Sequence, residues 1–224
     1  GIFEDYVSSA GVKVWKNRRI VGAEVGGGKI VSIRVEPSDG EGEARTVTAS
    51  MFIDCSYEGD LMAHSGVTYT VGREPNSLYD ETYNGVQLMT RHQFPDGVDP
   101  YVVPGDSTSG LLWGISEAEL LPDGSGDTLV QAYNYRICLT DDPDNMIPIT
   151  RPDNYDSTRY ELLLRLFEAQ PDKRRLNDYF IWSRMPNRKT DVNNRGGFST
   201  DAIGMNHNYP EAGYEERERI IRNH

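Results

Sequence analysis

Short runs of alternating apolar and polar residues, joined by turns, most limit what this chain can fold into. Over residues 29–36 the side chains alternate with the period of a half-buried strand. A run over 20–25 precedes it, and a shorter run over 46–48 follows an acidic, turn-rich connector at 37–44. Three strands with short connections predict a β-meander.

Three consecutive glycines, Gly26 to Gly28, separate the first two of these strands. They lack the Lys-Ser/Thr ending and the following helix of a phosphate-binding loop, so they predict a turn. Two more extended runs flank the meander, at 12–15 and at 51–53, and the second reads as a buried strand.

The second half of the chain has a different character. A strand is expected at 67–71, little periodicity over 76–126, the longest strand at 128–139 and a helix at 155–169. A stretch as long and irregular as 76–126 is often functional. The predicted apolar stripe of the helix consists of Tyr160, Leu163, Leu164 and Phe167.

Both ends of the chain have helical patterns. An apolar stripe over residues 3–10 is already running where the sequence starts, and Gly11 stands where a helix C-terminal glycine belongs. Residues 214–224 carry Glu-Arg pairs at i, i+4 spacing and have no breaker after them. We therefore expect a fragment of a longer protein.

Composition excludes several classes of function. The chain has 224 residues and a net charge of −12, which disfavours binding to nucleic acid. It has no apolar run long enough to span a membrane and no signal-peptide pattern. Its two cysteines and four histidines lack the spacing of a disulfide framework or a metal site. The compartment stays open between the cytoplasm and an exported soluble state.

The most specific feature is the segment 51–61, where an apolar run ends in small and acidic residues. A short helix is predicted to follow at 58–65, with Leu61 and Met62 facing inward. Ligands often collect at such strand-to-helix turns. The alternative is an ordinary turn in which Asp60 caps the helix.

The sequence of this segment resembles a motif of FAD-dependent oxidoreductases of the glutathione-reductase-like fold. At 53–61 it reads Ile-Asp-Cys-Ser-Tyr-Glu-Gly-Asp-Leu. It is most similar to the branch described as xanthan-lyase-like. Cys55 and Ser56 replace the usual Ala-Thr, both with small side chains. Further matches follow in family order at 69–74, 83–86, 131–136, 189–194 and 198–204.

The resemblance implies an α+β protein with FAD as cofactor. Residues 1–66 would belong to the FAD-binding domain with its meander, and residues 67–224 to a mixed sheet-and-helix substrate domain, incomplete here. Ile20 is expected beside the adenine through its backbone. The residues expected near the flavin or its phosphates are Asp54, Cys55, Ser56, Glu58, Gly59 and Asp60. The family's Gly-x-Gly-x-x-Gly motif is not in these residues, which agrees with a fragment.

Catalytic residues are only weakly indicated. His92 is either a general acid or base or an ordinary loop histidine. Arg136 either anchors a substrate carboxylate or pairs with a structural aspartate. Lys189 and Asn194 lie in a polar stretch, 189–197, that suits a sugar-like ligand or the flavin edge but equally suits Asx turns. We expect Cys55 to be a packed, inert thiol.

Two functions remain after these observations. The first is an FAD-dependent oxidoreductase acting on a small-molecule or carbohydrate substrate. The second is a carbohydrate-binding or polysaccharide-processing module without redox chemistry, supported by the aromatic content, the acidic surface and the polar stretch.

Overall fold

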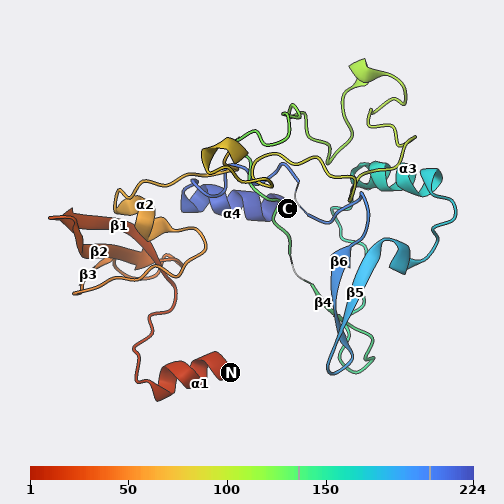
Figure 1. Ribbon diagram of the computed structural model, residues 1–224. Helices are drawn as coiled ribbons and strands as arrows, with labels where there is room; N and C mark the ends of the chain where they lie inside the picture. The colour runs from red at the N-terminus through yellow and green to blue at the C-terminus, as the bar shows by residue number, and fades with distance from the viewer. Residues whose placement is uncertain (136, 202) are drawn as a thin grey trace. The chain divides into compact units, whose positions relative to one another are not determined.

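The computed structural model describes residues 1–135, 137–201 and 203–224. The chain divides into two compact units, Gly1–Thr70 and Val71–His224. Helices accompany two separate three-stranded antiparallel sheets, one in each unit, which confirms the predicted α+β class (Figure 1).

The first sheet is the predicted meander. Strands β1 (Arg18–Gly26), β2 (Lys29–Pro37) and β3 (Arg45–Thr48) pair antiparallel in the order β1-β2-β3. Gly27 and Gly28 form the two-residue loop between β1 and β2, with φ of 58° and 76°. Two consecutive left-handed residues are what a tight hairpin with the right strand twist needs, so the predicted turn is confirmed.

The core of unit 1 lies between this sheet and the short helix α2 (Asp60–His64), which packs against β1. Leu61 and Val35 are buried, with exposed fractions of 5% and 7%. Ser32, also buried, donates to Glu24 across the β1–β2 pair at 2.9 Å. Met62, expected to face inward with Leu61, is instead exposed.

The two extended runs that flank the meander are not strands. Neither 12–15 nor 51–53 pairs with a strand in the described part of the chain. Met51 and Ile53 are 75% and 77% exposed, which corrects the prediction of a buried strand there. An apolar run forms a strand only where a neighbour offers a ladder, and the sheet ends at β3.

Helix α1 (Ile2–Ser9) confirms the predicted N-terminal helix. Gly11, with φ of 65°, ends it: the Gly11 N–H donates to the Ser8 carbonyl and the Val12 N–H to the Val7 carbonyl. This pair of bonds is a Schellman motif, and it requires a left-handed residue at that position.

Unit 2 is rich in loops. Its elements in chain order are the 3-10 helices η1 (Asn76–Leu78) and η2 (Ser107–Ser109), β4 (Cys138–Thr140), η3 (Ser157–Tyr160), α3 (Glu161–Ala169), η4 (Leu176–Asp178), β5 (Phe180–Met185), β6 (Lys189–Asn194) and α4 (Tyr214–Asn223). The only elements described between 76 and 126 are the two short 3-10 helices, as the lack of periodicity predicts.

The second sheet has the order β4-β6-β5 and is antiparallel throughout. Its hairpin pairs Met185 with Lys189, and the turn between them holds Asn187 and Arg188 in left-handed conformations, with φ of 60° and 57°. Phe180, Trp182 and Arg184 therefore share one face of the sheet with their β6 partners, and the intervening residues share the other.

The predicted long strand at 128–139 is wrong. Among the described residues of this range, only those from Cys138 belong to a strand, which is Cys138–Thr140. The upstream backbone bonds to side chains instead, because the Val130 N–H donates to His207 Nδ1 and the Gln131 carbonyl accepts from Asn206 Nδ2. The strand expected at 67–71 is likewise absent among the described residues; an isolated antiparallel bridge joins Arg73, just after this range, to Asp127.

Helix α3 occurs where it was expected, but its buried face differs. Leu162 and Leu166 are buried, whereas the predicted stripe residues Tyr160, Leu164 and Phe167 are exposed. Because leucines stand at four positions around this helix, the period alone does not fix which face packs.

Helix α4 confirms the predicted C-terminal helix. Its close ion pair joins Glu216 to Arg219 at i, i+3 spacing, and Arg222 lies 4.0 Å from Glu218 as the i, i+4 pattern suggests. Arg217 is buried, and it donates to the Tyr209 and Pro210 carbonyls at 3.1 and 2.8 Å.

Candidate functional site

The turn before α2 is organised by a single carboxylate. Asp54 accepts from the Ser56 N–H at 2.9 Å, from the Ser56 hydroxyl at 2.6 Å and from the Leu61 N–H at 3.2 Å. The Ser56 hydroxyl oxygen accepts in turn from the Gly59 N–H at 3.1 Å. Gly59 has a left-handed φ of 68°, which reverses the chain at the start of the helix.

This network lowers the pKa of Asp54, chiefly through the Ser56 hydroxyl and then through the Ser56 N–H. Asp54 caps α2 by accepting the Leu61 N–H, and Asp60 is the first residue of the helix. Its carboxylate already occupies the amides that a phosphate would need at this turn, and it adds negative charge there. The turn thus fits the hydroxyl-bearing part of a nucleotide cofactor better than its phosphates.

The other residues expected around FAD lie in the same unit. Ile20 is half-buried in β1, the strand against which α2 packs, and Glu58 and Asp60 are half-buried in the turn. Cys55 is exposed, which corrects the expectation of a packed thiol, because its run emerges from the sheet without a neighbouring strand.

Residues of two family-like segments, 69–74 and 83–86, contact the same stretch of unit 2, residues 124–128. Arg73 and Asp127 exchange both backbone hydrogen bonds, at 2.9 and 3.0 Å, and their side chains form a two-bond ion pair. This pairing lowers the pKa of Asp127. The Val86 N–H donates to the Ser125 carbonyl at 2.8 Å. We call this arrangement the loop clasp.

Glycines allow the backbone segments of the loop clasp to approach one another. A Cβ on Gly72 would lie 2.3 Å from the Asp127 carbonyl oxygen, and one on Gly85 would lie 2.6 Å from that of Ser125. Both residues also have left-handed φ, of 98° and 76°. These motif residues therefore have a structural role in the described chain.

Arg165, on helix α3, fixes the loop segment 99–102 through hydrogen bonds. Its guanidinium donates to the carbonyls of Asp99, Tyr101 and Val102 at 3.0, 2.6 and 3.2 Å. It also forms ion pairs with Asp99 and with Glu161, and its side chain is only 11% exposed. Nothing in the sequence marked this residue, because an arginine in a helix is normally a solvated surface residue.

His92 is exposed in the same loop with a left-handed φ of 60°. The next residues, Gln93 and Phe94, lie against Gly197, where an added Cβ would be 2.9 Å from the Phe94 nitrogen. A pocket of about 440 Å³ forms beside this contact, and it includes Trp113 and Phe198 among its lining residues. The loop and the family-like segment 198–204 are thus neighbours.

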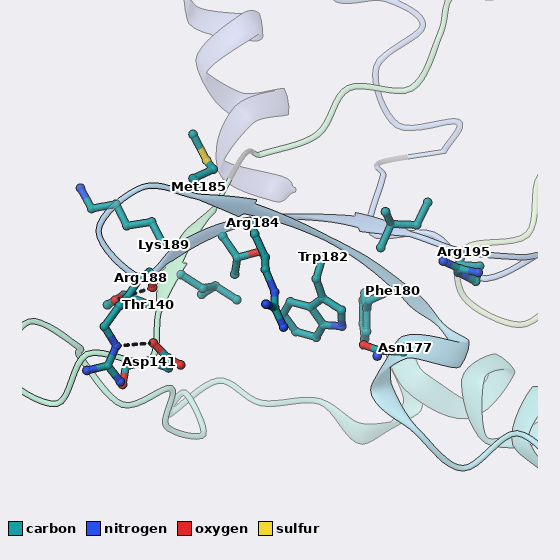
Figure 2. A pocket seen from close by; sticks show the side chains of 13 residues that line it. Thr140, Asp141, Asn177, Phe180, Trp182, Arg184, Met185, Arg188, Lys189 and Arg195 are labelled. Carbon is teal, nitrogen blue, oxygen red and sulfur yellow. Dashed lines mark hydrogen bonds and ion pairs between the residues drawn. The ribbon is translucent and has the colours of Figure 1, made fainter.

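A pocket with a volume of about 890 Å³ lies on the second sheet. Figure 2 shows Phe180, Trp182 and Arg184 side by side on one face of β5 and Met185 on the other, so the lining of the pocket draws on both faces of the strand. The other side chains that line it are Leu139, Thr140, Asp141, Asn177, Ile181, Met185, Arg188, Lys189, Thr190 and Arg195.

The structure places two of the catalytic candidates on β6. Lys189 lines the pocket, whereas Asn194 pairs with Phe180 in the sheet register and does not line the pocket. Arg136 lies outside the described residues. His92 is not among the residues that line this pocket, so the structure does not bring the candidates together.

None of the described helices combines the length and hydrophobicity that crossing a membrane requires. Over residues 1–135, 137–201 and 203–224, no group of three or more His, Cys, Asp or Glu side chains is arranged to hold a metal ion.

Comparison with known proteins decides the family. The sequence model of the family described as FAD dependent oxidoreductase matches residues 1–224. The chain belongs to the FAD dependent oxidoreductase family. No curated protein and no solved structure matches it. Membership of the FAD dependent oxidoreductases supports an oxidoreductase function, with FAD as the cofactor of the family.

Proposed function

We propose that this chain supplies part of the FAD site and the substrate domain of an oxidoreductase that acts on a carbohydrate-related substrate, in the xanthan-lyase-like branch of the family. Residues 1–66 are assigned to the FAD-binding domain and residues 67–224 to the substrate domain. The observation that carries the proposal is the Asp54 network before α2, which shapes the turn that the family-like wording indicates.

The chemistry of the turn supports a role beside the hydroxyl groups of the cofactor. Glu58 and Asp60 contribute carboxylate oxygens, which accept hydrogen bonds from hydroxyls. Asp54 keeps the turn in shape, and the backbone of Ile20 in the adjoining strand would hold the adenine. Bound FAD would supply the electron acceptor for oxidation of the substrate. The residues of this chain would bind the cofactor and the substrate, orient them toward each other and exclude water from between them.

A carbohydrate-binding module without redox chemistry is the second candidate. The observation in its favour is the ring pair of Phe180 and Trp182 in the pocket on the second sheet, with centroids 6.0 Å apart. Aromatic side chains bring a large apolar surface to ligand contacts, which suits the C–H faces of sugars. The family match favours the oxidoreductase.

The substrate class can be tested by flavin reduction. We expect the protein expressed from its complete coding region, loaded with FAD and kept anaerobic, to lose its visible flavin absorbance on addition of sugars. Matched small alcohols without a ring serve as the control, because they lack the face that an aromatic pocket recognises. Reduction by such alcohols but by no sugar would contradict the carbohydrate assignment and leave the oxidoreductase assignment intact.

A further inference from the structure

The pocket on the second sheet has an aromatic floor. Phe180 and Trp182 alternate along β5 on the face that the pocket covers, and their rings are inclined at 58° with centroids 6.0 Å apart. Both side chains are half-buried, so part of each ring contacts neighbours and part faces the pocket (Figure 2). A flat, partly apolar ligand would gain contact area there.

Cations surround this floor. Arg184 lies beside Trp182 and Arg195 lies beyond Phe180 in Figure 2, and Lys189, the register partner of Met185 on β6, lines the edge of the pocket. Within the described part of the chain, none of these three side chains forms an ion pair. A fourth cation, Arg188, is different, because it is held by Asp141 at 2.9 Å and lies 3.7 Å from Asp142.

The sequence around the pocket is basic although the chain is acidic. Residues 173–195 hold seven of the 23 lysines and arginines but only two of the 35 aspartates and glutamates. A local positive field in a protein of net charge −12 is a specific feature of this surface. Cations without a partner anion favour a ligand that brings one.

The size of the pocket and its polar groups narrow the range of ligand classes further. A volume of about 890 Å³ accommodates a ligand of a few rings. Asn177 lines the pocket and offers an amide, which can bond to hydroxyl groups. A planar guanidinium matches a carboxylate through two parallel hydrogen bonds.

We propose that this pocket binds a carboxylate-bearing sugar, with its ring against Trp182 and Phe180 and its carboxylate on Arg184. Lys189 and Arg195 add positive charge at the edges, which suits an oligosaccharide with more than one acidic unit. The proposal rests on the proposed function, because it names the substrate class of the same substrate domain.

Single-stranded nucleic acid also combines anionic groups with stacking rings. It is less favoured here because the rest of the chain, outside 173–195, is strongly acidic. That part contains 33 of the 35 acidic residues but only 16 of the 23 basic ones, and its negative charge repels a polyphosphate. Its binding is one outcome of the test below.

The test is calorimetric titration of the purified chain, without FAD, with a hexamer of galacturonic acid and, separately, with a hexamer of glucose. We expect the acidic hexamer to bind at least about tenfold more tightly, and added salt to weaken it. Arg184→Met and Trp182→Ala should each lower its affinity by about tenfold.

Arg34→Met is the matched control, because Arg34 is exposed on β2 in unit 1 and its loss changes the net charge equally. If Trp182→Ala loses its circular dichroism spectrum, Trp182→Phe replaces it, with a smaller loss expected. Equal weakening by Arg34→Met, equal binding of the two hexamers, or tighter binding of a single-stranded oligonucleotide would overturn the proposal.

Failure of this proposal and failure of the proposed function are distinguishable. The titration requires neither FAD nor turnover. Binding of the acidic hexamer without flavin reduction by any sugar would contradict only the proposed function, and flavin reduction by neutral sugars without acidic-sugar binding would contradict only the pocket assignment.

Discussion

Replacing Gly72 by alanine is expected to destabilise unit 2 by about 3–5 kcal/mol. The added Cβ would lie 2.3 Å from the Asp127 carbonyl oxygen and 2.6 Å from the Thr128 Cα, both of them backbone atoms that cannot move aside alone. The residue must also keep a φ of 98°, which strains any side chain. The loop clasp would open, together with the Arg73–Asp127 pair.

Gly97→Ala separates the cost of backbone strain from the cost of steric overlap by the added Cβ. Gly97 has a similar φ of 91° in the same unit, but no atom lies within 4 Å of an added Cβ. This substitution should cost only about 1–2 kcal/mol. Urea unfolding of unit 2 can be followed through Trp113 and Trp182 after Trp15, in unit 1, is changed to phenylalanine. Equal losses for Gly72→Ala and Gly97→Ala would show that the clasp is not tightly packed.

Arg165→Met is the second substitution with a large expected effect, about 2–4 kcal/mol. The guanidinium satisfies three carbonyls of the 99–102 segment and is nearly buried, so its removal leaves these acceptors without their donor. Methionine keeps much of the side-chain volume, so the loss reports the polar contacts. The measurement is urea unfolding in the same Trp15→Phe background.

Two companion variants divide the contribution of Arg165. Glu161→Gln removes only the i, i+4 pair with Arg165, and it should cost no more than about 0.5 kcal/mol. Arg165→Lys retains the charge but not the planar fork that spans several carbonyls, so it should recover only part of the loss. If Glu161→Gln cost as much as Arg165→Met, the carbonyl contacts would contribute little.

Local chemistry made the meander and the terminal helices predictable. The glycine turn before Lys29 and the position of Gly11 both require left-handed residues, which glycine adopts without strain. Helix α4 followed from its pattern as well. In these places the short-range signal and the tertiary structure agree.

Tertiary partners decided the segments that were predicted wrongly. The alternation over 128–139 is real, but its backbone meets the side chains of Asn206 and His207 rather than a neighbouring strand. The β5–β6 hairpin was missed, although Pro186 and Asn187 between two extended runs are a turn signal.

The candidate sites differ in the same way. The 54–61 turn was found because its residues are contiguous in the sequence, whereas the capping role of Asp54 was not anticipated. The pocket of Phe180, Trp182 and Arg184 was not found, since it depends on which face of β5 is covered and on side chains from β4 and η4. Alternation on a strand with two polar-lined faces does not reveal which one binds.

The central claim is that the Asp54 turn belongs to an FAD site, and FAD binding by the protein expressed from its complete coding region tests it most directly. The account predicts flavin absorbance that remains after gel filtration, and its loss or strong reduction in Asp54→Ala, where the turn loses its cap at a cost of about 1 kcal/mol. Asp39→Ala is the matched control, because Asp39 likewise accepts from a turn N–H in unit 1, that of Glu41, but lies outside 54–61. No retained flavin in the unaltered protein, or the same FAD affinity in Asp54→Ala as in Asp39→Ala, would contradict the account.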